Sequence, residues 1–109
     1  MKIIEAGGEY GKRDIYKLTK SPTIQKLSAH DGEILKVDKY VIYEDSENRD
    51  DPISILSIQS GETVIATNSA TAIREFRGIV EIMEGEEFSV RVLSGTAKSG
   101  RTYYTLELV

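Results

Sequence analysis

The chain lacks cysteine and tryptophan, and it has only one histidine and two prolines among its 109 residues. The absence of cysteine excludes disulfide bonds and zinc sites built on thiolates. No stretch approaches the roughly 18 consecutive apolar residues that a membrane helix requires. The first residues, Met1 to Glu5, lead into no long apolar block. We therefore expect no signal peptide, no membrane contact and a cytoplasmic location.

Groups that could carry catalysis are also scarce. The single histidine, His30, has the surroundings of a solvated turn residue. The run from Gly7 to Arg13 is not a phosphate-binding loop, because Ala6 replaces its first glycine and Arg13 stands where Ser or Thr must hold magnesium. The acidic run Asp45–Asp51 lacks the central glycine and terminal glutamate of a calcium loop. We expect no enzyme, no cofactor and no metal site.

The charge is unevenly distributed along the chain, whose formal net charge is -4. Residues 1–30 have a balance of +3, and the remaining residues have a balance of -7. Within that acidic part, residues 90–104 hold Arg91, Lys98 and Arg101 and no acid. Two interpretations stay open. Charges on a solvated surface cluster by chance, or a basic face binds phosphate and an acidic rim repels wrong partners.

Apolar and β-branched residues predict three strands in the middle of the chain, at Ile34–Glu44, Ile53–Ser60 and Thr63–Thr67. Strict alternation fails at Asp38-Lys39 in the first of them, so we expect a bulge or a bend there. The polar run Glu44–Pro52 predicts a long hairpin loop between the first two strands.

A helix is predicted after the third strand, with Asn68 or Ser69 as its N-cap. Its apolar stripe has spacings of three and four residues: Ile73, Phe76, Val80 and Met83. Gly78 costs a helix interior about 1 kcal/mol relative to alanine. One alternative therefore ends the helix at Gly78 and leaves Ile79–Met83 extended; the other ends it at Glu84–Glu86.

Residues 1–30 have no clear periodicity. Ser21-Pro22 resembles the start of a short helix that would end by Asp31-Gly32, and a partly mobile arm is equally allowed. We therefore divide this single domain into residues 1–30, a basic arm or first-strand region, and residues 31–109. The second part follows the order β-β-β-α-β-β. That order predicts a mainly-β, OB-fold-like five-stranded barrel with one helix, a fold whose strand faces and loops often bind oligonucleotides.

The last predicted hairpin, Phe88–Val109, has a basic tip. Lys98-Ser99-Gly100-Arg101 forms the turn, and Tyr103 and Tyr104 follow directly. Cations beside aromatic rings suit a single nucleic-acid strand, because cations bind phosphates and flat rings stack on bases.

Four of the six tyrosines lie in predicted strands, as the pairs Tyr40 and Tyr43, and Tyr103 and Tyr104. In each pair we expect at least one ring to face outward. The alternative is that tyrosine simply suits half-buried sheet positions with its hydroxyl in water.

Three segments, Tyr40–Asp45, Thr67–Ile73 with Phe76, and Ser94–Tyr103, resemble small single-stranded DNA-binding proteins encoded by phages and prophages of Gram-positive bacteria. The likeness covers about two thirds of the chain, from Asp31 to Arg101. It implies an OB-fold, a homo-oligomer (dimer or larger), and sequence-tolerant binding of single-stranded DNA during phage DNA replication or recombination in the host cytoplasm. Replication or recombination proteins would then be further partners.

We expect the binding residues to form four functional sets. In the hairpin, Lys98 and Arg101 contact phosphates, and Tyr103 or Tyr104 stacks on a base. Two further cations, Arg91 and Lys36, line the groove. The N-terminal clamp consists of Lys12, Arg13 and Lys17. The alternatives are a non-enzymatic protein-interaction module and a minor structural component of a phage particle, because one fold hosts many functions.

Overall fold

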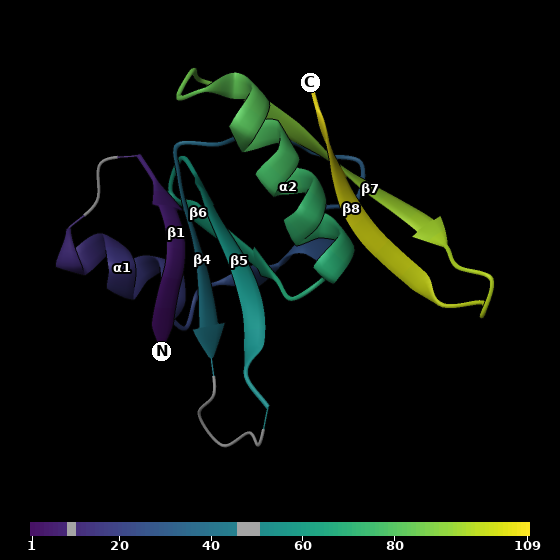
Figure 1. Ribbon diagram of the computed structural model, residues 1–109, viewed down its shortest axis with the longest axis horizontal. Coiled ribbons are helices and arrows are strands. Elements are labelled where there is room, and N and C mark those ends of the chain that lie inside the picture. Colours follow the sequence, from purple (N-terminus) through teal and green to yellow (C-terminus); the bar gives the residue numbers. More distant parts are fainter. Residues whose placement is uncertain (9–10, 46–50) are drawn as a thin grey trace.

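Two β-sheets and two α-helices make up the chain in a computed structural model that describes residues 1–8, 11–45 and 51–109 (Figure 1). The elements are, in chain order, β1 (Lys2–Gly7), α1 (Lys12–Thr19), β2 (Gln25–Lys26), the 3-10 helix η1 (Leu27–His30), β3 (Ile34–Lys36), β4 (Lys39–Asp45), β5 (Ile53–Ser60), β6 (Thr63–Thr67), α2 (Ala70–Met83), β7 (Ser89–Thr96) and β8 (Thr102–Leu108). One sheet has the order β1-β4-β5-β6-β2 and the other the order β3-β7-β8.

The three central strands are close to their predicted positions. β5 and β6 have the predicted boundaries, whereas the predicted strand Ile34–Glu44 is divided into β3 and β4. The division falls at the predicted interruption and sends the two halves into different sheets. The Asp38 carboxylate stabilises this bend, because it accepts a hydrogen bond of 2.6 Å from the Gly61 N–H. Of the predicted Glu44–Pro52 loop, residues 46–50 lie outside the described residues.

Helix α2 begins where the sequence predicts, and it extends beyond Gly78, where one of the two alternatives ends it. The Ser69 hydroxyl caps it by accepting a hydrogen bond of 3.2 Å from the Ala72 N–H. The helix continues past Gly78 to Met83, so the alternative with Ile79–Met83 extended is wrong. Ile79 is buried in the core, and Val80 and Met83 pack against it. Burial of such side chains contributes about 1.5–3 kcal/mol each and outweighs the cost of one glycine.

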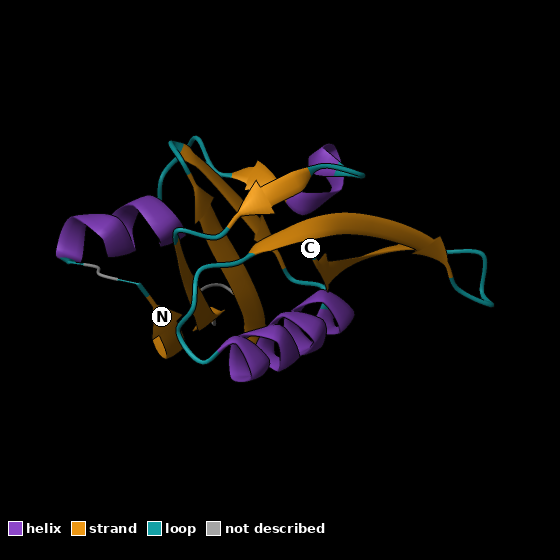
Figure 2. Ribbon diagram, turned by 90° about the horizontal axis from the view of Figure 1, so that it is seen from above, coloured by secondary structure: helices purple, strands orange, loops and turns teal. Residues whose placement is uncertain are grey.

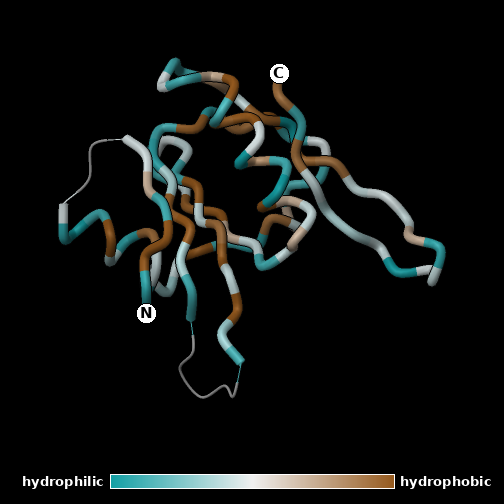
Figure 3. Tube along the Cα trace, in the orientation of Figure 1, coloured by the Kyte–Doolittle hydropathy of each residue, from teal (hydrophilic) through white to brown (hydrophobic). Residues whose placement is uncertain are grey.

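The main core lies between α2 and the two sheets (Figures 1 and 2). The fully buried Phe76 ring is at its centre, with its centroid 4.8 Å from the Tyr40 ring in an edge-on arrangement. Phe88 also packs against Phe76, with a distance of 5.9 Å between the ring centroids. Figure 3 shows the hydrophobic residues concentrated in the central strands. One core therefore joins both sheets.

A second, smaller core covers the opposite face of the five-stranded sheet. Leu18 of α1 packs there with Val41, Tyr43 and Val64. Tyr40 and Tyr43 are 9% and 5% exposed, so the expectation that one ring of this pair faces outward is wrong. Both rings are buried because the sheet is covered on both faces, and burial raises the pKa of each phenol.

The N-terminal region is more ordered than its sequence pattern predicts. β1 pairs with β4, and α1 precedes the predicted helix start at Ser21-Pro22, which instead lies in a turn. The alternative with a helix beginning at Ser21 is therefore wrong. At the start of α1, the Asp14 carboxylate accepts hydrogen bonds from the Gly11 N–H at 2.8 Å and from Lys39 Nζ at 3.0 Å. Both hydrogen bonds lower the pKa of Asp14, and the bond from Gly11 has the larger effect.

The sheets do not close into a barrel within the described part of the chain, and the expected count of five strands and one helix is inexact. The extra elements come from residues 1–30 and from the division of the first predicted strand. β2 pairs in parallel with β6, through Gln25 with Ile65 and Lys26 with Ala66. β2 therefore forms the edge of the five-stranded sheet next to β6. Both α-helices in the described ranges are too short and too polar to cross a membrane.

Candidate functional site

The β7–β8 hairpin projects from one end of the molecule and ends in hydrophilic residues (Figures 1 and 3). Its turn is closed by two hydrogen bonds of 2.9 Å, from the Ala97 N–H to the Arg101 carbonyl and from the Gly100 N–H to the Ala97 carbonyl. Gly100 has φ +86°, a conformation that favours glycine. Lys98 and Arg101 are exposed at this tip, and neither has an ion-pair partner in residues 1–8, 11–45 and 51–109. Two cations are thus available to a ligand.

Tyr103 lies beside the tip, with its side chain held against a glycine. It pairs across the strands with Gly95, and a Cβ added to Gly95 would stand 2.6 Å from Cζ and Oη of the tyrosine. The Tyr103 residue is 42% exposed. In this pair, then, the expectation of one outward ring is confirmed. Tyr104 is half-buried and packs against the main core.

The same contact between tyrosine and glycine occurs once more, in the interior. Gly7 pairs with Tyr40, and a Cβ on Gly7 would stand 2.2 Å from Cε1 of that ring. Because Tyr40 is buried beside Phe76, its ring serves the core. The Tyr103 ring has no such role and remains accessible to a ligand.

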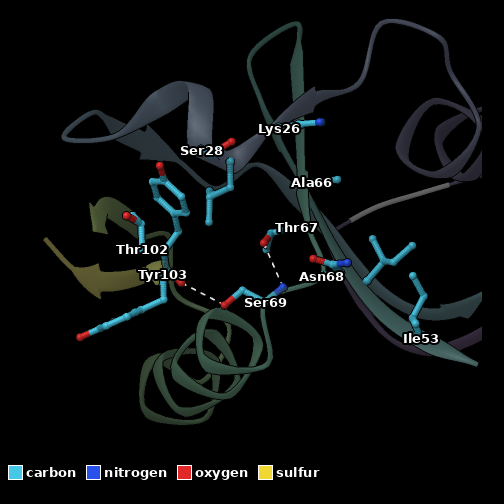
Figure 4. A pocket seen from close by; sticks show the side chains of 12 residues that line it. Lys26, Ser28, Ile53, Ala66, Thr67, Asn68, Ser69, Thr102 and Tyr103 are labelled. Atoms are coloured by element: carbon cyan, nitrogen blue, oxygen red, sulfur yellow. Dashed lines mark hydrogen bonds between the residues drawn. The ribbon is translucent and has the colours of Figure 1, made fainter. Parts of the chain in front are cut away.

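A cleft of about 670 Å³ opens next to Tyr103, between the end of β6 and the start of β8 (Figure 4). Its walls come from β2, η1, β5, β6 and β8 and from the residues just before α2: Lys26, Leu27, Ser28, Ile53, Ile55, Ala66, Thr67, Asn68, Ser69, Thr102, Tyr103 and Tyr104. No carboxylate is among these lining residues, and Lys26 is their one charged side chain. Such a cleft suits an uncharged or anionic group.

Ser69 links α2 to β6 and β8 at this cleft. Its hydroxyl caps α2 and also donates a hydrogen bond of 3.0 Å to the Tyr104 carbonyl, and its N–H donates to Thr67 Oγ1 at 3.1 Å (Figure 4). The Val109 N–H donates a hydrogen bond to the Ser89 carbonyl of β7. Along an antiparallel strand, every second residue directs its backbone N–H and C=O toward the paired strand, and the residues between them direct theirs away. The backbone groups of Thr102 and Tyr104 therefore turn away from β7, toward the cleft.

Arg91 and Lys36 lie together on β7 and β3, apart from the hairpin tip. Arg91 Nη1 is 3.0 Å from Glu107 Oε1, and Lys36 Nζ is 4.0 Å from Glu87 Oε2. Both cations therefore have a carboxylate partner already. Their predicted place in a binding groove stays a prediction, with weaker geometric support than Lys98 and Arg101 have.

Lys12, Arg13 and Lys17 lie on α1, at the end of the molecule opposite the hairpin (Figures 1 and 2). The nine predicted residues thus fall into three separate groups, of which the four on β8 and its turn are the largest. Sequence reasoning missed Lys26, which lines the cleft. Lys26 belongs to the basic segment 1–30, and this was the one feature of the sequence that could have indicated it. The pairing of β2 with β6, which places it at the cleft, is not visible in the local sequence pattern.

No protein-family model matches the chain, and neither a curated protein nor a solved structure matches it. Among the described residues, no three His, Cys, Asp or Glu side chains gather as a potential metal site. The hairpin and its cleft therefore stand as the candidate site on their geometry alone.

Proposed function

We propose that this protein binds single-stranded DNA, without catalysis and with little sequence preference, through the hairpin tip and the cleft beside it. The observation that carries the proposal is the arrangement on β8 and its turn. Lys98 and Arg101, two cations without an ion-pair partner in the described ranges, lie next to the exposed ring of Tyr103, which packs against Gly95. Cations bind phosphates of any sequence, and an aromatic ring stacks on any base at about 1–3 kcal/mol per base. The carboxylate-free cleft gives the neighbouring nucleotides a place to bind.

We also propose that the architecture is OB-fold-like, with β3 and β4 as one bent first strand. Supporting this, β3 pairs with β7 while β4 pairs with β5, so one stretch of chain joins both sheets. In OB-folds the second and third strands and the loops before the second and last strands commonly contact oligonucleotides. Here those strands are β5 and β6, and the turn before β8 holds Lys98 and Arg101. The resemblance to phage single-stranded DNA-binding proteins supports a role in replication or recombination, in a host cytoplasm.

The second candidate function is peptide binding by a protein-interaction module. It is favoured by the edge of β8 turned away from β7, where the backbone groups of Thr102 and Tyr104 face the cleft and the Tyr104 carbonyl accepts a hydrogen bond from Ser69 Oγ. An extended peptide can add to such an edge as a further strand. Peptide binding of that kind would depend little on salt, and this difference separates the two functions.

A fluorescence-anisotropy titration of labelled oligo-dT with the full chain, at two salt concentrations, tests the proposal. We expect binding that weakens with salt, with a log-log slope of about -0.7 for each phosphate neutralised on a single strand. A duplex of equal length, the control, should bind more weakly. Absence of binding at micromolar protein in low salt would sink the proposal, and salt-independent binding or a preference for duplex would favour the peptide-binding module.

We further infer that the protein forms a dimer or a larger homo-oligomer. β1 is an edge strand, and Met1, Ile3 and Ile4 at this edge are exposed apolar side chains. Unpaired edges of this kind favour association, and linked copies gain affinity for one DNA strand through effective concentration. Light scattering should give at least twice the mass of one 109-residue chain. The mass of a single chain at working concentration would contradict this inference.

A further inference from the structure

Helix α1 carries a second group of cations around an exposed aromatic ring. Leu18 buries one face of the helix against the small core, and Asp14 and Ile15 are half-buried beside it. At 3.6 residues per turn, the opposite arc of roughly 140° contains only cations and one tyrosine. The members of this arc are Lys12, Arg13, Tyr16, Lys17 and Lys20.

Tyr16 is the centre of this arc. It is 58% exposed and belongs to neither core. Lys12 and Lys20 lie one turn before and one turn after it, since residues four apart share a helix face. The acid on the helix, Asp14, is half-buried and accepts hydrogen bonds from the Gly11 N–H and Lys39. The arc thus repeats the chemistry of the hairpin tip on a different element.

We propose that the outer face of α1 is a second contact surface for the same nucleic-acid strand, on which Tyr16 stacks on a base while Lys12 and Arg13 bind phosphates. This inference rests on the proposed function. Charge complementarity carries the choice of ligand, because an anionic strand with flat bases matches a face made only of cations and an aromatic ring.

The positions of the two surfaces set the length of strand required. α1 and the hairpin tip lie at opposite ends of the longest axis, which measures 40 Å (Figure 1). A stacked strand advances about 3.4 Å per nucleotide, so this axis corresponds to roughly 12 nucleotides. A strand of about six nucleotides reaches only one surface. A longer strand reaches both and gains affinity through effective concentration.

The test compares Tyr16→Ala with wild type on oligo-dT of about six and about 14 nucleotides, lengths on either side of that span. We expect Tyr16→Ala to weaken binding of the longer oligonucleotide about tenfold and that of the shorter less than twofold. Tyr16→Phe, which keeps a flat ring, should bind both as wild type does. Ile82→Ala on α2, which removes another exposed apolar side chain, is the matched control.

A second measurement reports on Tyr16 directly. The chain has no tryptophan, so its tyrosine emission is observable. Adding the longer oligo-dT should quench this emission less in Tyr16→Phe than in wild type. The proposal of a second surface would be overturned if Tyr16→Phe showed the same quenching as wild type and Tyr16→Ala kept the affinity for the longer strand. If the hairpin were still required for binding both lengths, the proposed function would be unaffected.

The remaining outcomes also separate the two proposals. If wild-type protein binds neither length, the proposed function fails and the second surface fails with it. If Tyr16→Ala changes the oligomeric mass in light scattering while binding both lengths normally, α1 contacts another copy of the chain, and the second surface for the strand is refuted.

Discussion

Replacing Lys98 and Arg101 together by alanine is expected to lower the affinity for single-stranded DNA about tenfold or more. Both side chains are exposed on the turn, and neither has an ion-pair partner in the described part of the chain. The loss of two phosphate contacts should also flatten the log-log salt slope by roughly one unit. Substitutions in such a turn usually change stability by less than about 0.5 kcal/mol, so the fold should persist. Anisotropy titrations at several salt concentrations measure both effects.

Arg74→Ala with Arg77→Ala is the matched control for this experiment. It removes the same two positive charges, from α2, where each arginine is within 3.9 Å of a glutamate. Exposed pairs of this kind contribute little to stability. If the control loses as much affinity as the hairpin variant, general charge governs binding and the hairpin has no special part. If the hairpin variant binds as the parent does, the hairpin is only a connector, and the cations of α1 become the main site.

Tyr103→Ala is expected to reduce binding by about 1–3 kcal/mol, which is roughly 5- to 150-fold in Kd. The melting temperature should hardly change, because the Tyr103 ring contributes to neither core. Tyr103→Phe should retain the affinity, since stacking needs the ring and not its hydroxyl. Tyr104→Ala should have the opposite effect, a loss of about 1–3 kcal/mol in stability, because that ring packs against the core.

Gly95→Ala tests the geometry of Tyr103 without removing its ring. The new Cβ would stand 2.6 Å from the end of the ring, so the side chain must move away from the strand. We expect Gly95→Ala to weaken binding in the wild-type background and to have no further effect in Tyr103→Ala. A double-mutant cycle measures this coupling. Equal effects in both backgrounds would show that the glycine acts independently of Tyr103.

Sequence reasoning succeeded where a local pattern decides the structure. The bounds of the strand Ile53–Ser60 and the Ser69 cap depend on neighbouring residues, and both are seen in the structure. It failed where distant segments meet. The burial of Tyr43 depends on Leu18, and the parallel pairing of Lys26 with Ala66 depends on a fold that no local pattern specifies.

The candidate site shows the same limit. The hairpin cations Lys98 and Arg101 are separated by only two residues, so the local sequence pattern could show that they lie close together. The cleft needs contributions from four strands and the 3-10 helix η1. The separation of Lys12 from Lys98 depends on the whole arrangement of the chain. Residue types therefore indicated a chemistry, but not which of those residues act together.

The division of the long strand at Asp38 also constrains the order of folding during synthesis. β4, β5 and β6 are consecutive and can pair as soon as they leave the ribosome. β3 precedes them, yet Leu35 pairs with Val90, which is synthesised 55 residues later. Ile34 and Leu35 therefore cannot pair until β7 has been synthesised, and contacts of such long sequence separation form slowly. A nascent chain arrested before β7 would hold a paired β4–β5–β6 meander and an unprotected β3, a state prone to premature association.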